Sequence, residues 1–277
     1  YQSVKSLNET SSYSCDDYFG YVEDGSTGYN NLYTNKNINI GVGRFPVTKV
    51  DQAEVLVNKV KQYYALEPGE WRTKVLSLAD DNDEQTSSSS YHSFLSHQEE
   101  AISALKSVEP RMNVTRLYWD NFNCDMSGGS RRYPEVTAAI TKKFSEGSLI
   151  FNYLGHSSYN AISAEHSYSI SQVQSIYNKI YPVWFAGSCN LSQYDDFRTS
   201  FGEEIILNPN GGAIASIGAV RTAYASPNLS LDKDFLRQAF NPENEYRLGK
   251  IHRAAKTARG QDSNKMVYIL LGDPGLN

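Results

Sequence analysis

Two reactive side chains, His156 and Cys189, each follow a stretch of sequence that predicts a buried β-strand. His156 comes after the apolar run 148–153, and Cys189 comes after the run 182–187. Ligands of an open parallel sheet bind at the carboxyl ends of its strands, so both side chains are candidates for a site. A cysteine nucleophile needs a general base within reach and backbone N–H groups for the oxyanion, and a neighbouring imidazole would supply the base.

The two candidates gain weight as a pair because their strands are consecutive in the sequence. Consecutive parallel strands joined by a right-handed crossover commonly lie side by side, about 4.8 Å apart. Gly155 and Gly187 let the backbone turn sharply beside each reactive residue. Each residue alone has a structural alternative, since a cysteine at a strand end is often a small buried hydrophobe and a loop histidine is often polar surface.

The elements that would position this pair alternate between strand and helix from residue 70 onward. Apolar runs predict strands at 74–79, 114–119, 148–153, 182–187, 212–218 and 266–271. Helical patterns fill the intervals at 90–108, 134–146, 169–180 and 199–207, with two more helices around Asn241 and Pro242. This alternation is typical of an α/β fold with a mainly parallel sheet and helices on both faces.

The first 69 residues have a different character, being polar and rich in Ser, Asn, Tyr and Gly. Period-two alternation predicts a short strand at 37–43, and apolar spacing predicts a helix from Val50 to Leu66. We interpret 1–69 as part of a preceding subdomain and 70–277 as the catalytic α/β domain. The chain opens at Tyr1 without Met, so we expect a piece of a longer protein.

Composition argues against several classes of protein. The 277 residues carry 31 acidic and 26 basic side chains, a net charge of −5, which does not suit a nucleic-acid partner. No run of about 18 apolar residues occurs. Cys15, Cys124 and Cys189 are far apart and form no Cys-x-x-Cys pair, so a zinc ribbon or a disulfide scaffold is not expected. Neither a glycine-rich phosphate loop nor a G-x-S-x-G elbow is found.

Several segments, taken in order, resemble the gingipain family of cysteine peptidases. The stretch from Asn152 to Ser158 and the stretch from Ala186 to Cys189, which ends 33 positions after His156, are similar to the family's histidine and cysteine motifs. Further similar segments lie at 43–47, 210–216, 225–227 and 271–274, so the resemblance covers about residues 40–275. Residues 12–20 and the stretch after Cys189 are similar to the PorU-like branch, the sortase-like signal peptidases of type IX secretion.

The resemblance implies a caspase-like α/β fold and thiol-dependent peptide cleavage. Cys189 would be the nucleophile and His156 the base, with the N–H groups of Ser157 and Cys189 as oxyanion donors. A carboxylate at the end of an earlier strand supports the histidine in this family, and the matching stretch makes Asp80 the first choice and Asp81 the second. Such a carboxylate would fix the imidazole tautomer and favour its charged form.

One departure from the family pattern leaves a second function open. Gly normally follows the catalytic histidine, whereas this sequence has Ser157, which still offers an N–H but restricts the backbone more. The alternative is therefore a catalytically inactive scaffold, or a component of the secretion machinery that binds signal domains without cutting them.

Further expectations concern the rim of the site. Arg221 and Tyr224 follow the strand 212–218, and the resemblance makes their loop a wall of the substrate pocket, with simple packing as the alternative. Asp195 and Asp196 either cap the next helix, which is the favoured interpretation, or contact substrate, and His252 is expected on a helix surface. The acidic run 80–84 is either a solvated loop or a structural calcium site without EF-hand spacing.

The resemblance also implies partners and a location. Substrates would be the C-terminal signal domains of secreted proteins, and the acyl-enzyme would pass to water or to an amine on a surface glycolipid. We expect an extracytoplasmic protein at the bacterial outer membrane or cell surface, with an outer-membrane partner. The thiol needs no metal or organic cofactor.

Overall fold

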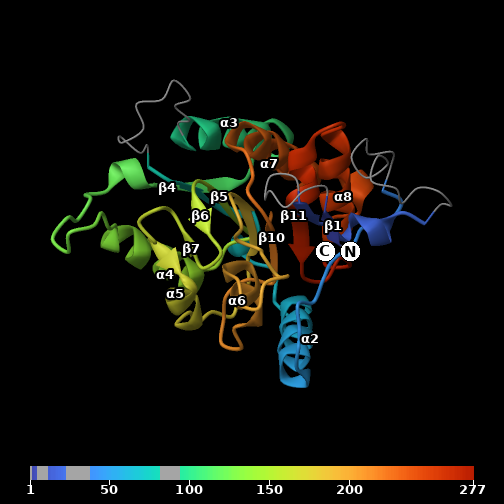
Figure 1. The fold of residues 1–277 in the computed structure, drawn as a ribbon, viewed down its shortest axis with the longest axis horizontal. Coiled ribbons are helices and arrows are strands. Elements are labelled where there is room, and N and C mark those ends of the chain that lie inside the picture. The colour runs from blue at the N-terminus through green and yellow to red at the C-terminus, as the bar shows by residue number, and fades with distance from the viewer. Residues whose placement is uncertain (1, 5–11, 23–37, 82–93) are drawn as a thin grey trace.

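A six-stranded sheet forms the centre of the computed structural model, which describes residues 2–4, 12–22, 38–81 and 94–277 (Figure 1). Its order is β11-β10-β9-β5-β3-β4. All neighbours pair in parallel except β11, which runs antiparallel to β10. The strands are β3 (Lys74–Ala79), β4 (Asn113–Tyr118), β5 (Ile150–Leu154), β9 (Val183–Gly187), β10 (Ala215–Ala219) and β11 (Tyr268–Leu271). The mainly parallel α/β fold is confirmed.

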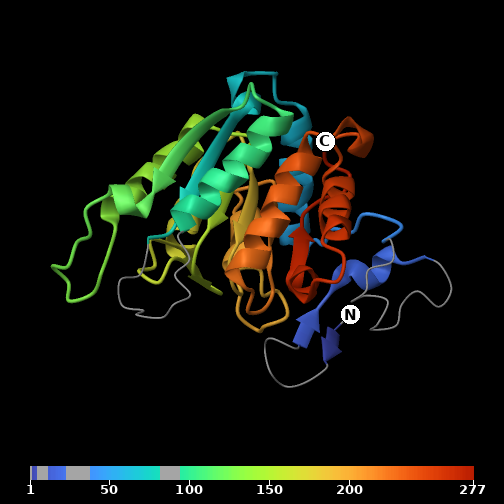
Figure 2. The same ribbon diagram turned by 90° about the horizontal axis from the view of Figure 1, so that it is seen from above.

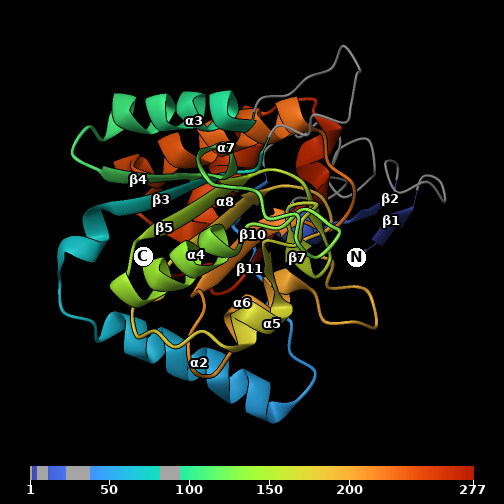
Figure 3. The same cartoon turned by 90° about the vertical axis from the view of Figure 1, so that its left-hand side faces the viewer.

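Helices cover both faces of the sheet. Figure 2 shows α3, α7 and α8 packed side by side across one face. The helices of the other face lie below the sheet in Figure 3, with α2 outermost against α6. The helices are α2 (Val50–Tyr64), α3 (Phe94–Val108), α4 (Pro134–Glu146), α5 (Ile170–Gln174), α6 (Phe201–Leu207), α7 (Ala225–Ala239) and α8 (Leu248–Ala258).

Two small sheets and several short 3-10 turns complete the fold. One small sheet follows β5 directly and consists of β6 (Ser157–Ser158), β7 (Ala161–Ile162) and β8 (Tyr168–Ser169). The other pairs β1 (Gln2–Val4) with β2 (Ser12–Ser14). A 3-10 turn at Asp16–Gly20 continues from β2.

Alternation along β9 explains how one strand serves two helical layers. Trp184 stacks on Phe144 of α4 with ring centroids 6.2 Å apart, whereas the next residue, Phe185, stacks on Phe235 of α7 at 4.8 Å. Successive strand side chains point to opposite faces, so a continuous apolar run buries both. Each such aromatic contributes about 1.5–3 kcal/mol when fully buried.

Helix α2 is attached to the sheet domain through a buried lysine. Lys59 is 3% exposed, and its Nζ donates to the carbonyl of Ile206 in α6 at 2.9 Å and to that of Gly211, just beyond this helix, at 2.8 Å. Burial lowers the pKa of Lys59 to about 7. The main chain of Arg44, further upstream, forms an isolated parallel β-bridge with Leu271, the last residue of β11. Residues before position 70 thus contact this domain, and the proposed division at residue 69 stays a prediction.

Two predicted elements differ from the structure. Residues 38–43 form no regular strand, because a Cβ on Gly41 would lie 2.3 Å from the carbonyl carbon of Gly249, so this stretch packs against backbone instead of pairing. The helix predicted at 169–180 ends at Gln174, because the Asn178 side chain bonds to Ile180 O at 2.6 Å and to the Gly212 N–H at 2.7 Å. Among the described residues we find no helix with the length and apolar character that a bilayer crossing demands.

Candidate active site

His156 and Cys189 stand at the ends of two adjacent parallel strands. Leu154 of β5 pairs with Gly187 of β9, and each reactive residue comes two positions later. The expected adjacency of these strands is confirmed. The Ser157 hydroxyl donates to the carbonyl of Cys189, so the two loops touch directly. The separation of the thiol and the imidazole, expected within roughly 3–6 Å for an apo pair, stays a prediction.

The Cys189 thiol is half-buried against the loop between β10 and α7. Its Sγ donates to Ala223 O at 3.3 Å and accepts from Ala223 N–H at 3.4 Å. The next residue, Asn190, has φ of 54°, and its N–H donates to Arg221 O at 3.1 Å. A non-glycine residue in the left-handed region is uncommon and persists where its surroundings hold it. The nucleophile candidate therefore sits at the head of a tightly turned loop.

The main chain of His156 is fixed from both sides. Its N–H donates to Asp80 Oδ2 at 2.8 Å, and its carbonyl accepts from Tyr153 Oη at 2.6 Å and from Ser163 N–H at 2.8 Å. The exposed imidazole packs edge-on against Phe94 at the start of α3, with ring centroids 5.1 Å apart. The imidazole thus extends outward from a main chain that three hydrogen bonds hold in place.

Asp80 lies directly under His156. It is 1% exposed, and burial raises its pKa well above the ordinary value, while the bond from the His156 N–H opposes that rise. A Cβ on Gly155 would lie 2.5 Å from Asp80 Cβ and 2.2 Å from Tyr153 Oη, which explains the glycine at this position. The contact of Asp80 is with the main chain of His156, so its expected support of the ring stays a prediction.

Asp81, the second choice, takes part in a different cluster. Its carboxylate pairs with Arg131 and accepts from Tyr133 Oη at 2.7 Å. Carboxylate oxygens of Asp80, Asp81 and Glu165 lie within 4.8 Å of one another, a donor set that suits calcium. Arg131 also pairs with Glu165 at 3.4 Å and so already supplies positive charge at this place. The arrangement fits the guanidinium better than a metal ion, and the calcium expectation stays untested.

Ser157 does not strain the backbone where the family has glycine. The positive φ angles among the described residues do not include Ser157. It pairs with Ile162 across β6 and β7, and the bond from Ser163 N–H to His156 O makes this a non-hydrogen-bonded pair. In such a pair the N–H points away from the partner strand. The Ser157 N–H is therefore not used by the β6–β7 ladder.

The two rim residues are placed differently. Arg221 is 8% exposed, and its guanidinium holds Asp195 through two bonds of 2.8 and 2.5 Å. Tyr224 is 55% exposed. Substrate contact stays a prediction for both, but the pairing of Arg221 favours a structural role. The expected capping by Asp195 and Asp196 is wrong, because Ser200 is the N-cap of α6.

Sequence reasoning missed a chain of hydrogen bonds behind the Cys189 loop. Tyr268 Oη donates to Asn228 Oδ1 at 2.7 Å, and Asn264 donates to the same oxygen at 2.8 Å. Asn264 in turn accepts from Tyr224 N–H at 2.7 Å. No spacing in the sequence predicts these contacts, because they join residues on separate elements.

A second buried polar chain lies between the sheet and the α3–α7 layer. Ser77 of β3 donates to Gln98 of α3 at 2.9 Å, and Gln98 donates to Asn152 of β5 at 2.8 Å. Asn152 then donates to Asp232 of α7, which is fully buried. Burial raises the pKa of Asp232 to about 8.

His252 is another buried titratable group, and its expected surface position is wrong. It is 5% exposed because it lies on the buried face of α8, together with Leu248, Ile251 and Ala255. Burial lowers its pKa well below the ordinary value, with nearby Lys256 adding to that effect.

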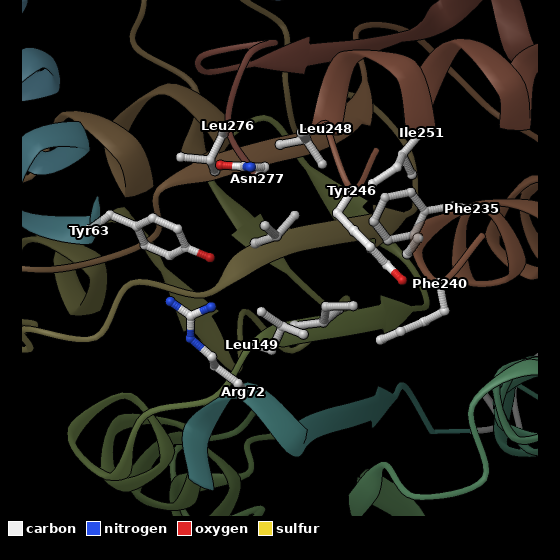
Figure 4. Close-up of a pocket in the computed structure, with 13 residues that line it drawn as sticks. Tyr63, Arg72, Leu149, Phe235, Phe240, Tyr246, Leu248, Ile251, Leu276 and Asn277 are labelled. Atoms are coloured by element: carbon white, nitrogen blue, oxygen red, sulfur yellow. The ribbon is translucent and has the colours of Figure 1, made fainter. Parts of the chain in front are cut away.

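An apolar cavity lies remote from this site. It measures about 250 Å³ and includes Ile150 and Val183, the first residues of β5 and β9 (Figure 4). Arg72 points toward the Tyr63 hydroxyl at its side. The reactive pair stands at the other end of the same strands.

Comparison with known proteins agrees with the fold. Gingipain R (RgpB), an Arg-specific cysteine proteinase, superposes with a TM-score of 0.72 at 17% identity over 95% of this chain and 59% of that chain. The complex of Porphyromonas gingivalis RgpB pro- and mature domains gives 0.71 at 16% identity over 95% and 60%. A structure described as a protease gives 0.63 at 15% identity over 83% and 54%. These likenesses show the fold, and the chain spans less than two thirds of each of those chains.

Membership of a family comes from the sequence itself. No curated protein matches the sequence. The profile of peptidase family C25 matches residues 1–277. Because that match covers the whole chain, the chain belongs to peptidase family C25, the gingipain family of cysteine peptidases.

Proposed function

We propose that this chain is the catalytic domain of a cysteine peptidase, with Cys189 as nucleophile and His156 as proton carrier. The observation that carries the proposal is the pairing of Leu154 with Gly187, which brings the two loops to one edge of the sheet. The bond from the Ser157 hydroxyl to Cys189 O ties these loops together. Membership of family C25 agrees with this assignment.

The chemistry would proceed in two halves. His156 takes the thiol proton as Cys189 Sγ bonds to the peptide carbonyl carbon, and the N–H groups of Ser157 and Cys189 receive the oxyanion. His156 then returns the proton to the leaving amine, and the C–N bond breaks to leave a thioester. In the second half His156 deprotonates water or an acceptor amine, which attacks the thioester and releases the thiol.

Asp80 would act as a positioning residue in this scheme. Its bond to the His156 N–H, together with the Tyr153 hydroxyl on the carbonyl, sets where the imidazole starts. Ser157 has no positive φ, so we propose that its N–H donates as that of glycine would. This supports activity over the inactive-scaffold alternative.

We further propose the PorU-like role within the family. The support is the similarity of residues 12–20 and of the stretch after Cys189 to that branch. Substrates are then the C-terminal signal domains of type IX secreted proteins, with water or a surface glycolipid amine as acceptor. An extracytoplasmic place at the outer membrane or cell surface and an outer-membrane partner belong to the same proposal. A calcium ion does not, because Arg131 already pairs with Asp81 and Glu165.

The test is release of C-terminal signal domains from secreted cargo by the full-length protein in its cell envelope. Cys189→Ala and His156→Ala, at protein levels matched to the wild type, should each stop release. Normal release by Cys189→Ala would end the peptidase proposal and favour a signal-domain scaffold. Cleavage of a generic peptide by the wild type without any release of signal domains would keep the peptidase and remove its PorU-like role.

A further inference from the structure

Residues 12–20, named the N-terminal strap here, reach the loop that follows the nucleophile candidate. The Ser14 hydroxyl donates to Tyr194 Oη at 2.8 Å, and Tyr194 Oη donates to Asp16 Oδ1 at 3.4 Å. These partners are 180 and 178 positions apart in the sequence. Tyr194 is half-buried and lies five residues after Cys189.

Arg44 completes the hold on Tyr194. Its guanidinium binds both oxygens of Asp16, at 2.7 and 2.6 Å, and stands 4.4 Å from the centre of the Tyr194 ring. The Arg44 backbone donates to Leu270 O at 2.9 Å, which anchors it to the edge strand β11. Asp16 is 6% exposed, so this ion pair has one largely desolvated partner and is worth more than an open surface pair.

From Tyr194 a series of contacts leads back to Asn190, the residue that follows Cys189. The neighbouring Asp195 is paired with Arg221, and the carbonyl of Arg221 receives the Asn190 N–H at 3.1 Å. Gln193 N–H donates to Asn190 O at 3.2 Å and closes the turn. Asn190, with φ of 54°, needs such outside support.

The strap is also fastened at its other side. Asp17 pairs with Lys256, which is 1% exposed and donates to Tyr268 O at 2.8 Å. Cys15 is fully buried, and burial raises the pKa of its thiol to about 12. The strap is therefore part of the core and has a fixed place from which to hold Tyr194.

We propose that the N-terminal strap and Arg44 position the Cys189 loop through Tyr194. Asp16, Arg44 and Tyr194 are then positioning residues for the thiol, although none of them reaches it. The part of this inference that concerns turnover rests on the proposed peptidase function, whereas the mechanical coupling does not.

The coupling is tested by hydrogen exchange of the loop in the full chain. Tyr194→Phe removes the hydroxyl and keeps the ring, and it should speed exchange of the Asn190 and Gln193 amides about fivefold, as loss of one or two hydrogen bonds allows. Tyr181→Phe is the matched control, because its hydroxyl donates at 2.6 Å to Gln62 on α2 instead. Cys15 should stay protected from alkylation in both variants, which shows that the strap remains docked.

A double-mutant cycle and kinetics complete the test. Asp16→Asn and Tyr194→Phe should have effects that do not add, because both act through the same contact. Peptide cleavage should lose about fivefold in kcat in Tyr194→Phe with KM unchanged, since substrate contacts are intact. Unchanged exchange of the loop amides in Tyr194→Phe and Asp16→Asn would overturn the inference. Faster exchange with an unaltered kcat would overturn the part that concerns turnover. If the wild type cleaves no peptide while Tyr194→Phe still speeds exchange of the loop amides, the positioning of the loop by the strap would stand and the peptidase proposal would fall.

Discussion

The loop that carries His156 and the loop that carries Cys189 are held in different ways. His156 has its main chain bonded to Asp80 directly after β3, to Tyr153 of β5 and to Ser163 directly after β7. The Cys189 loop is held by Arg221 and, through Tyr194, by the N-terminal strap. The first set of contacts is local to the sheet, and the second set gathers distant parts of the chain.

This difference predicts different sensitivities. Buried hydrogen bonds are costly to leave unmade, so the His156 side should respond sharply to removal of a partner. Partly exposed ion pairs are worth less, so the Cys189 side should lose order gradually. The proposed proton carrier is thus held by the sheet, whereas the loop of the proposed nucleophile is held by distant parts of the chain.

The largest effect is expected from the reactive pair itself. Cys189→Ala and His156→Ala should each lower peptide cleavage by at least about a thousandfold, and the double variant should lose little more, because residues of one catalytic unit are not additive. Cleavage rates with circular dichroism as a folding check would measure this. Additive losses would mean that the two residues do not work together.

The next effect isolates the His156 side of the comparison. Asp80→Ala leaves the His156 N–H without its partner and should lower kcat about 10–100-fold, whereas Asp80→Asn keeps an accepting oxygen and should lose far less. Kinetics of the two variants, with urea unfolding as control, make the measurement. Equal losses would show that the charge of Asp80, and not its bond to the main chain, is what matters.

A third prediction concerns the buried polar chain between the sheet and the α3–α7 layer, in which Asp232 of α7 bonds to Asn152 of β5. Burial raises the pKa of Asp232 from 3.8 to about 8, so the folded chain holds this proton more tightly than the unfolded chain. Its favourable contribution is complete below about pH 4 and is lost as the pH rises through about 8. Asp232→Asn cannot ionise and should be more stable than the wild type at pH 8, by about 1–3 kcal/mol.

Urea unfolding of both proteins at pH 5 and pH 8 would check the sign. The free energy of unfolding should fall between these pH values by a smaller amount in Asp232→Asn. The same fall in both proteins would show that Asp232 does not set the pH dependence. Asp80, whose pKa is also raised, is present in both and cancels in the difference.

The smallest effect is expected at the rim beside Cys189. Tyr224 is 55% exposed, so Tyr224→Ala should leave the fold intact and raise KM a few-fold with kcat nearly unchanged, as loss of a substrate contact would. Steady-state kinetics with peptides of different length would measure it. An unchanged KM for every peptide would assign Tyr224 to the surface alone.

Most strands of the sheet were predictable because they are apolar runs between turn residues, whereas the edge strand β4 also carries the exposed Arg116. The pairing of β5 with β9 followed from the crossover rule, and it located His156 and Cys189 together. The start of α6 could have been placed better, since Ser200 and Glu203 form a capping box. The sequence pattern was sufficient to predict those elements whose structure is set by their own residues.

Contacts between distant residues could not be read in this way. Nothing in the sequence distinguishes a carboxylate that binds the His156 N–H from one that binds its ring. The contact of Tyr194 with Ser14 spans 180 positions and depends on the docking of the whole strap. Burial of His252 likewise follows from how α8 packs, which periodicity alone did not show.

The lysine that attaches α2 also has a chemical consequence. With its pKa lowered to about 7, Lys59 carries a larger share of neutral amine near neutral pH than an ordinary lysine, and neutral amine is the form that acylating reagents attack. The docked helix shields it, because Nζ is enclosed by the carbonyls of Ile206 and Gly211. Lys59 therefore reports on helix release by its accessibility: it would resist acylation while α2 is docked. Once the helix lifts away, its pKa would return toward the ordinary value and it would react like the exposed Lys61, which is modified throughout.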